Sequence, residues 1–254
     1  MSWSALGRSF DAVADIYDEV RPDYPDDVYA SIERVSGAWS GARVLDVAAG
    51  SGIATRQLAA RGATVVACDP GLPLLRRLRA RDNRACAVAA TAEHLPFRAG
   101  VFDLACCATA FHWFDAARAV DELRHVLRPR GVLALWWANH RRDDAIPWEA
   151  AQGAVHDRWS VRGGSRPPSP RGIGLRDTAA FLRSSGLDVV VDTRLTWSRV
   201  VSRETHLKVL STHSDVIALG AASRDLLAEI GAALAPWPQV EERLWGPLVV
   251  ARMP

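Results

Sequence analysis

The stretch Arg43-Val-Leu-Asp-Val-Ala-Ala-Gly-Ser-Gly52 decides the fold of this chain. It runs a short apolar strand straight into a turn of small residues, and it places Asp46 where strand becomes loop. A second strand-like run, Thr64-Val-Val-Ala-Cys-Asp69, also ends in an acid, and this acid lies seventeen residues after Gly52. At this spacing a strand–helix–strand unit offers a carboxylate to a ribose. The two acids therefore predict one nucleoside site.

The turn differs from the dinucleotide-binding fingerprint, which opens with glycine and sets a pyrophosphate on a helix N-terminus. A carboxylate at Asp46, a few Å from a diphosphate, would repel it by roughly 1 to 4 kcal/mol. S-adenosylmethionine carries a sulfonium, an ammonium and a ribose diol, and it has no phosphate. The two acids therefore favour S-adenosylmethionine as the cofactor.

Strands and helices alternate through the first half of the chain. Apolar runs predict strands at 44–47, 64–68, 86–89, 102–107 and 132–137, and helical patterns fall at 26–35, 51–60, 70–80 and 116–127. This alternation predicts an α/β fold with a doubly wound, mostly parallel sheet. Right-handed crossovers then place the ligand-bearing loops at the carboxyl ends of the strands.

The second half has a looser pattern. Residues 139–175 are rich in proline and glycine, so we expect loops there, with partial mobility at 162–174. A helix at 178–185, a strand at 187–191, a mostly helical insertion at 203–235 and a last strand at 248–252 follow.

Composition limits the class of protein. With 254 residues, 49% of them hydrophobic, the chain can form one sizeable core, and we expect one domain rather than two independent ones. A net charge of +2 is too small to indicate nucleic acid. The longest apolar run, 132–138, is far shorter than the ~20 residues of a membrane span, and we expect a cytoplasmic protein without a membrane anchor.

The cysteines carry no metal or disulfide signal. They lack C-x-x-C spacing and nearby paired histidines, so buried reduced thiols in strands are expected and no metal site is predicted. They are Cys68, Cys86, Cys106 and Cys107.

Several short motifs, in a fixed order, carry a resemblance to a known family. They are Phe10-Asp-Ala-Val-Ala-Asp-Ile-Tyr17, Arg21-Pro-Asp-Tyr-Pro25, Val44-Leu-Asp-Val-Ala-Ala-Gly-Ser-Gly52, Ala92-Glu-His-Leu-Pro-Phe97, Val101-Phe-Asp-Leu104, Phe111-His-Trp-Phe114 and Val126-Leu-Arg-Pro-Arg-Gly131. Over roughly residues 8–138 the chain resembles the class I S-adenosylmethionine-dependent methyltransferases, within them the small-molecule group often labelled methyltransferase type 11. Two departures are Ala48, in place of the first glycine of the turn, and Thr91, where an acid often contacts adenine.

The resemblance implies a seven-stranded, Rossmann-like sheet with a helical lid in a single domain, 1–254. We expect the core at 37–138, 176–200 and 244–254, and the lid at 1–36, 139–175 and 201–243. The family places a tyrosine and an arginine near the methionine carboxylate, which implies Tyr17 and Arg21 here, although packing on a helix surface would also explain them.

The predicted cofactor residues follow from the two strand-end acids and from the resemblance to the family. Asp46 and Asp69 also fit helix-capping roles, and Glu93 is as well explained by solvent as by a site contact. The predicted cofactor-binding residues are Tyr17, Arg21, Asp46, Ala48, Gly50, Gly52, Asp69, Pro70, Ala92, Glu93 and Thr109.

The acceptor is expected next to Phe111-His-Trp-Phe114, which follows the fourth strand. A histidine with an ordinary pKa near 6.5 can take a proton from an acceptor, so His112 is the candidate catalytic base. A structural histidine is the alternative, because methyl transfer often needs only alignment. The predicted substrate and lid residues are Tyr24, Phe111, Trp113, Trp137 and Asn139.

The sequence thus predicts transfer of a methyl group to a small-molecule oxygen or nitrogen in secondary metabolism, with oxygen favoured. Two alternatives stay open. One is a fold relative that binds the cofactor but catalyses a cyclisation or isomerisation, and the other is a non-catalytic partner that activates another methyltransferase. The acceptor, C-methylation and the oligomeric state are also left open.

Overall fold

The computed structural model describes residues 13–82, 86–161 and 172–254. The chain forms two compact units, each made of three segments. The sheet unit comprises Asp23–Trp137, Pro168–Leu195 and Gly246–Pro254, and the helical unit comprises Met1–Pro22, Ala138–Pro167 and Thr196–Trp245. Residues 23–36, which we expect in the lid, therefore fall in the sheet unit.

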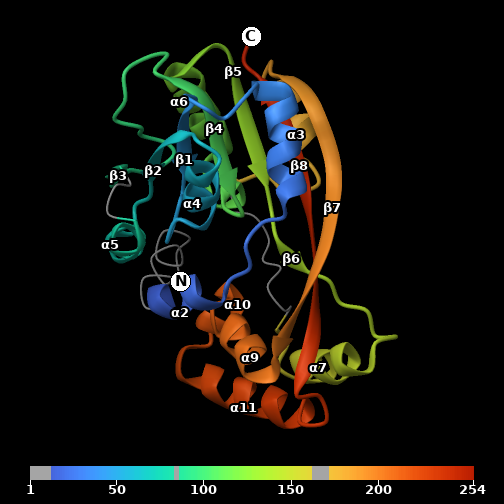
Figure 1. The fold of residues 1–254 in the computed structure, drawn as a ribbon. Helices are drawn as coiled ribbons and strands as arrows, with labels where there is room; N and C mark the ends of the chain where they lie inside the picture. Colours follow the sequence, from blue (N-terminus) through green and yellow to red (C-terminus); the bar gives the residue numbers. More distant parts are fainter. Residues whose placement is uncertain (1–12, 83–85, 162–171) are drawn as a thin grey trace. The chain divides into compact units, whose positions relative to one another are not determined.

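The sheet unit is built on parallel strands (Figure 1). Their order is β3-β2-β1-β4-β5, and an antiparallel strand, β8, continues the sheet beside β5 and pairs with β7. The bounds are β1 Arg43–Val47, β2 Thr64–Cys68, β3 Cys86–Val88, β4 Phe102–Ala108, β5 Leu127–Trp136, β7 Asp188–Ser202 and β8 Gln239–Arg252. Because β1, β2, β4 and β5 run parallel as neighbours, the loops that follow them meet at one edge of the sheet.

Helices pack on both faces of this sheet. The alternation of side chains along a strand sends Leu45 to the cluster formed with α6 and α8, and Val44 to the cluster formed with α3 and α4. The helices of the unit are α3 Asp26–Ser36, α4 Ile53–Ala60, α5 Leu72–Arg81, the 3₁₀ turn η2 Phe111–Trp113, α6 Ala116–Val126 and α8 Thr178–Ser184. The predicted doubly wound α/β fold is confirmed.

The helical unit has its own apolar core, which includes Val155, Leu210, Leu226 and Ile230. Its elements are α2 Ala14–Val20, β6 Asn139–His140, α7 Pro147–Arg158, α9 Arg203–Ser211, α10 Ser214–Ile217, η3 Gly220–Ala222 and α11 Ser223–Ala233. The short β6 pairs with the first half of β8. The helical character predicted for 203–235 is confirmed.

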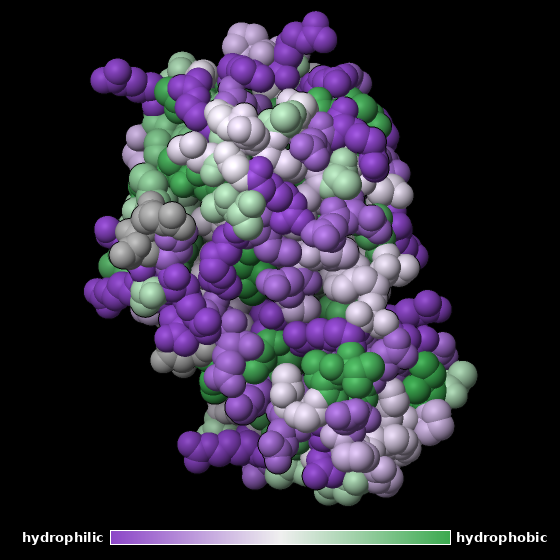
Figure 2. Space-filling model, in the orientation of Figure 1, coloured by the Kyte–Doolittle hydropathy of each residue, from purple (hydrophilic) through white to green (hydrophobic). Residues whose placement is uncertain are grey.

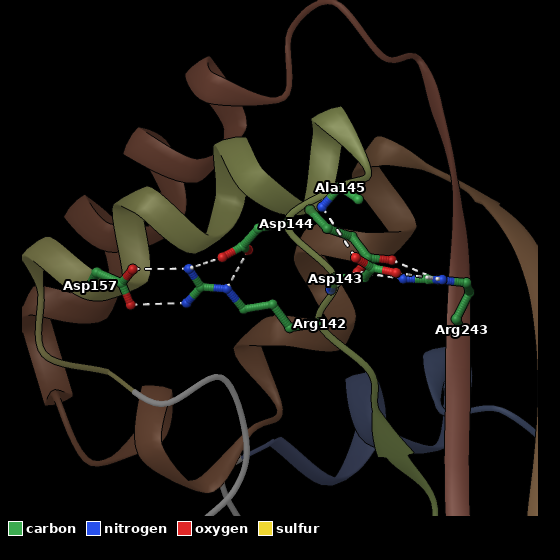
Figure 3. A network of polar contacts seen from close by, with 7 residues as sticks. Arg142, Asp143, Asp144, Ala145, Asp157 and Arg243 are labelled. Atoms are coloured by element: carbon green, nitrogen blue, oxygen red, sulfur yellow. Dashed lines mark hydrogen bonds and ion pairs between the residues drawn. The ribbon is translucent and has the colours of Figure 1, made fainter.

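Ion pairs fix the segment before and along α7 (Figure 3). The guanidinium of Arg142 lies between Asp144, at 2.7 Å, and Asp157, at 2.9 Å. Arg243, from β8, pairs with Glu149 at 2.9 Å and with Asp143 at 3.5 Å. These contacts connect α7 to β8 within the helical unit.

Several predicted bounds of loops and strands, and the predicted number of strands, are wrong. The predicted loop 139–175 contains β6 and α7, and most of the stretch 162–174 lies outside the described residues. Strand β5 starts at Leu127 instead of 132, because the pairing with β4 shifts register between Phe102 and Leu104 and absorbs Pro129 in a bulge. Strands β7 and β8 are about three times longer than predicted, and the sheet of the described residues has eight strands instead of seven.

The burial of the cysteines, the length of the helices and the polarity of the surface complete the description of the fold. Cys68, Cys106 and Cys107 are buried as predicted, whereas Cys86 is exposed. Among the described helices, none has the length and apolar character that crossing a bilayer requires. Figure 2 shows mostly hydrophilic side chains on the face it draws, with hydrophobic ones in small groups.

Candidate functional site

The turn after β1 is the centre of the candidate site. Three of its residues have positive φ, namely Ala48 at 55°, Gly50 at 56° and Gly52 at 88°. A Cβ on Gly52 would lie 2.7 Å from Cγ of Leu78, so this position needs glycine for both its φ and its space. Glycine at 52 lets the turn pass closely over α5 as it leads into α4.

Asp69 ties this turn to the next strand. Its Oδ2 accepts a hydrogen bond from the backbone N–H of Gly50 at 2.9 Å, and its Oδ1 accepts one from that of Gly71 at 2.7 Å. A carboxylate can accept hydrogen bonds from backbone N–H groups and from the hydroxyls of a diol alike. The two predicted cofactor positions, 50 and 69, are therefore in direct contact.

Asp46 lies beneath the turn and is fully buried. Its Oδ2 accepts a hydrogen bond from the hydroxyl of Thr55 at 2.6 Å, and its Oδ1 lies 3.6 Å from Sγ of Cys106. Burial raises the pKa of Asp46 to about 6, because an ionised carboxylate loses its hydration there. The direct contact of Asp46 with a ligand ammonium stays a prediction.

Tyr24 and Thr109 meet beside the turn. The two hydroxyls are 3.0 Å apart, and Thr109 has a φ of 57° while its N–H donates to the carbonyl of Trp136 at 2.7 Å. Gln57 of α4 accepts from the N–H of Tyr24 at 3.1 Å and donates to its carbonyl at 2.8 Å. Tyr24 thereby connects α4 to the loop after β4.

His112 lies in the short 3₁₀ turn that follows β4. The indole N–H of Trp137, just after β5, donates to Nδ1 of His112 at 3.1 Å. The ring of Trp113 lies beside the imidazole, with the two centroids 5.0 Å apart. Burial lowers the pKa of His112 to about 4, so the imidazole is neutral at pH 7.

Two of the predicted substrate residues belong to the core. Phe111 is fully buried and packs edge-on against Phe114, with centroids 5.7 Å apart, and the side chain of Trp137 is 1% exposed. These side chains support the turn that carries His112. Trp113 is partly buried.

The loop at 92–97 is held by carboxylates. Glu93 accepts a hydrogen bond from the N–H of Asp115 at 2.9 Å, and Glu122 accepts one from the N–H of Leu95 at 2.8 Å. Ala92 is buried, whereas Pro70, after β2, is exposed. Glu93 thus has a structural contact at the start of α6, and its contact with a cofactor stays a prediction.

Three predicted residues belong to the helical unit. Arg21 donates through Nε to the hydroxyl of Thr212 at 2.9 Å and through a terminal nitrogen to its carbonyl at 2.9 Å, and its guanidinium lies 4.8 Å from the ring centroid of Tyr17. Asn139 donates to the carbonyl of Trp245 at 3.4 Å. The roles predicted for Tyr17, Arg21 and Asn139 stay predictions.

The same unit buries a polar cluster that the sequence did not indicate. His206 contacts Oε1 of Glu242 at 2.7 Å and Oε1 of Gln152 at 2.6 Å, and Arg199 pairs with the other carboxylate oxygen of Glu242 at 2.7 Å. Burial by itself would raise the pKa of Glu242, but the bond from His206 and the neighbouring positive charge of Arg199 outweigh it and lower the pKa to about 2. Glu242 is therefore ionised at neutral pH.

Sequence reasoning missed Thr55, Gln57, Gly71 and Cys106, which hold the site residues in place. Thr55 and Gln57 had a usable signal, because polar side chains early in a helix that follows a glycine turn can reach back to the turn. Cys106 gave none, since it sits in a continuous apolar strand.

Comparisons with known proteins agree on one class. Residues 45–135 match the family described as "Methyltransferase domain". An uncharacterized methyltransferase of Mycobacterium tuberculosis (strain ATCC 25618 / H37Rv) is 38% identical over 153 residues, which are 60% of each chain. The matched region therefore spans about 60% of the length of the first curated relatives.

Two further matches are longer. The demethylmenaquinone methyltransferase of Thermobifida fusca (strain YX) is 31% identical over 186 residues, covering 69% of this chain and 77% of that protein. The solved structure of a candidate type II methyltransferase from Anaeromyxobacter dehalogenans aligns with a TM-score of 0.68 and 27% identity, covering 92% of this chain and 97% of that one.

Proposed function

We propose that this chain, which belongs to the class I S-adenosylmethionine-dependent methyltransferases, transfers the methyl group of S-adenosylmethionine to an oxygen of a small-molecule acceptor. The observation that carries the proposal is the contact between Asp69 and Gly50, which joins the glycine turn to the acid that ends the second strand. This arrangement offers a carboxylate to a ribose diol at the carboxyl edge of a parallel sheet. The proposed location is the cytoplasm, within secondary metabolism.

The residues present fit the cofactor. The buried charge of Asp69, together with Asp46 below the turn, favours a cationic ligand over a diphosphate. The positive φ values at 48, 50 and 52 turn the backbone tightly at the end of β1, which lets a ligand approach the main chain closely. Asp69 would hold the ribose, and the residues of the turn would lie along the amino-acid part.

The chemistry needs alignment more than acid–base groups. Bound S-adenosylmethionine supplies an electrophilic methyl group. The protein's part is to hold the acceptor in line with that group and to keep water out, and a fixed geometry of this kind is worth roughly 7 to 11 kcal/mol. The bond between Tyr24 and Thr109 and the packed turn 111–114 give the loop after β4 the rigidity that this task requires.

The acceptor class is supported by the comparisons only in outline. One relative is named for methylation of demethylmenaquinone, a small molecule, and the net charge of +2 gives no support for nucleic acid. We propose a small-molecule acceptor for this chain.

Calorimetric titration with S-adenosylmethionine tests the proposal, with NADH as a parallel ligand. We expect micromolar binding of S-adenosylmethionine alone, and its loss in Asp69→Ala. Asp188→Asn, an exposed acid of β7, is the matched control and should bind as the wild type does. Equal binding of NADH, or undiminished binding by Asp69→Ala, would require withdrawing the proposal.

Product mass separates methyl transfer from the alternatives. A methyltransferase adds one CH₂ equivalent to its acceptor, whereas a cyclase or isomerase leaves the mass unchanged. A non-catalytic partner would bind S-adenosylmethionine without any turnover.

A further inference from the structure

The hydrogen bond between Trp137 and His112 determines which nitrogen of the imidazole carries the proton. An indole N–H can only donate, so Nδ1 of His112 must be the acceptor in the 3.1 Å contact between them. A neutral imidazole has one accepting and one donating nitrogen. The proton of the neutral ring therefore lies on Nε2, and Nε2 is a donor.

The surroundings hold the ring in this state. Trp137 is buried and cannot turn its indole away without disturbing the core, and Trp113 packs beside the imidazole with centroids 5.0 Å apart. Among the residues that the structure describes, none is recorded as a hydrogen-bond partner of Nε2. The burial that lowers the pKa of His112 to about 4 also keeps the ring neutral at physiological pH.

The position of this donor connects it to the proposed reaction. His112 follows β4, and β4 lies next to β1 in the sheet, so the two loops share the carboxyl edge. The tautomer argues against the base that we expect from the sequence, because the only nitrogen with a free electron pair is already bonded to the indole.

We propose that Trp137 fixes His112 as a hydrogen-bond donor that positions the acceptor through Nε2–H, and that the acceptor is an acid whose oxygen is already ionised, such as a carboxylate. This inference rests on the proposed function and names its substrate class. An ammonium acceptor would need a base to remove its proton, which a neutral imidazole with an occupied Nδ1 does not provide.

The step balances without proton transfer. One carboxylate oxygen forms a bond to the methyl carbon, and the bond between that carbon and sulfur breaks with its electron pair going to sulfur. The negative charge of the acid and the positive charge of the sulfonium disappear together, and the products are a neutral ester and a neutral thioether.

The position of the hydrogen bond on the acceptor follows from the charges. A donor to the attacking oxygen would stabilise the reactant more than the transition state, because that oxygen loses charge as the bond forms. Nε2–H of His112 should therefore bind the other carboxylate oxygen. Its loss should raise KM more than it lowers kcat.

Nuclear magnetic resonance tests the tautomer directly and does not depend on activity. Two-bond proton–nitrogen correlations of ¹⁵N-histidine-labelled protein at pH 7 should show His112 as a single Nε2–H tautomer, assigned by its absence in His112→Gln. Trp137→Phe should give a mixture of both tautomers. An Nδ1–H tautomer in the wild type would overturn the proposal.

Kinetics with matched acceptors test the role. The panel pairs aryl and alkyl carboxylic acids with the amines of the same skeleton, and mass gain reports the product. For a methylated acid, His112→Ala should raise KM by about 10- to 150-fold, the effect of losing a hydrogen bond to a charged group, with kcat changed less than about threefold. His112→Gln keeps an N–H donor without a basic nitrogen and should recover most of the affinity, and His125→Ala, an exposed histidine of α6, is the matched control.

The outcomes are distinct. Methylation of the amines instead of the acids, or of neither class while S-adenosylmethionine binds, would overturn the assigned acceptor class. A loss of kcat in His112→Gln equal to that in His112→Ala would indicate a base. Failure to bind S-adenosylmethionine would refute the proposed function, while the tautomer measurement would stand by itself.

Discussion

Asp46→Asn should make the protein more stable at neutral pH while weakening its binding of S-adenosylmethionine. Asp46 is fully buried, and burial raises its pKa from 3.8 to about 6. A group whose pKa is higher in the folded state than in the unfolded state loses stability as the pH rises between the two values. The ionised carboxylate therefore destabilises the fold at pH 7, and asparagine has no charge to bury.

The magnitude follows from that shift. The pKa of Asp46 is about 2 units higher in the folded state than in the unfolded state. At ~1.36 kcal/mol per unit, ionisation of Asp46 lowers the free energy of unfolding of the wild type by about 3 kcal/mol at pH 7. The hydroxyl of Thr55 would bond an asparagine more weakly than it bonds the carboxylate of Asp46. This weaker bond offsets ~1 kcal/mol of the stabilisation that removing the charge provides. We expect a net stabilisation of about 1 to 2 kcal/mol, or about 2 to 8 °C in the melting temperature.

The pH dependence distinguishes this cause from a packing effect. At pH 4.5 the penalty in the wild type falls to about 1 kcal/mol, since Asp46 is then largely protonated in the folded state, and the advantage of asparagine should nearly vanish. Scanning calorimetry of both proteins at pH 7 and pH 4.5 measures the difference. The exposed Asp188→Asn is the control and should move the melting temperature little at either pH.

Two results would refute this reasoning. One is an asparagine variant that is less stable than the wild type at pH 7, which would mean that the hydrogen bonds of Asp46 outweigh the cost of its burial. The other is a stabilisation of equal size at both pH values, which would remove ionisation as the cause. Binding of S-adenosylmethionine is measured on the same samples, and an unchanged affinity would exclude Asp46 from cofactor binding.

Two further predictions concern the glycine turn and the buried polar cluster of the helical unit. Gly52→Ala should lower both the melting temperature and the affinity for S-adenosylmethionine, each measured by calorimetry, because its φ is 88° and a Cβ there would lie 2.7 Å from the side chain of Leu78. Gly50→Ala should have a smaller effect, because its φ is 56° and a Cβ there would meet open space. Equal effects of the two substitutions would contradict the steric argument. Glu242→Gln should destabilise the protein at pH 6, and the difference from the wild type in melting temperature should shrink as the pH falls toward 2, because a lowered carboxylate pKa stabilises the fold only above that range. A difference that does not change with pH would show that the ionisation of Glu242 is not responsible.

The parts of the site that the sequence predicted are local. Asp46, Gly50, Gly52 and Asp69 each occupy a position defined by a short apolar strand and the turn that follows it, and such a pattern is readable within about ten residues. The doubly wound fold was predictable for the same reason, since each strand and helix of the sheet unit has its own periodicity.

The parts that the sequence did not predict depend on pairs that are far apart in the chain. The tautomer of His112 is set by Trp137, 25 residues later, and the long strand β8 is defined by its antiparallel partners. The sequence pattern did not predict helix α7, because two polar residues, Glu149 and His156, lie on its buried side. Arg243 of β8 pairs with Glu149 there. A pattern search expects apolar residues on such a face.

The unfavourable features of this chain gather where the nucleoside site is proposed. Left-handed backbone at a residue with a Cβ costs roughly 1 to 2 kcal/mol, and Ala48 and Thr109 both have it, at the ends of neighbouring strands β1 and β4. Asp46, with its unfavourable ionisation, lies two residues before Ala48 and is the register partner of Cys106 in β4. Arg130 and Ser160 share the positive φ but sit in a bulge and after a helix, so backbone strain alone does not identify a site. What distinguishes the edge of β1 and β4 is that strain and a buried charge coincide there, and such costs persist when the surrounding structure fixes a geometry that function needs. The gain in stability expected for Asp46→Asn is the direct measure of that cost.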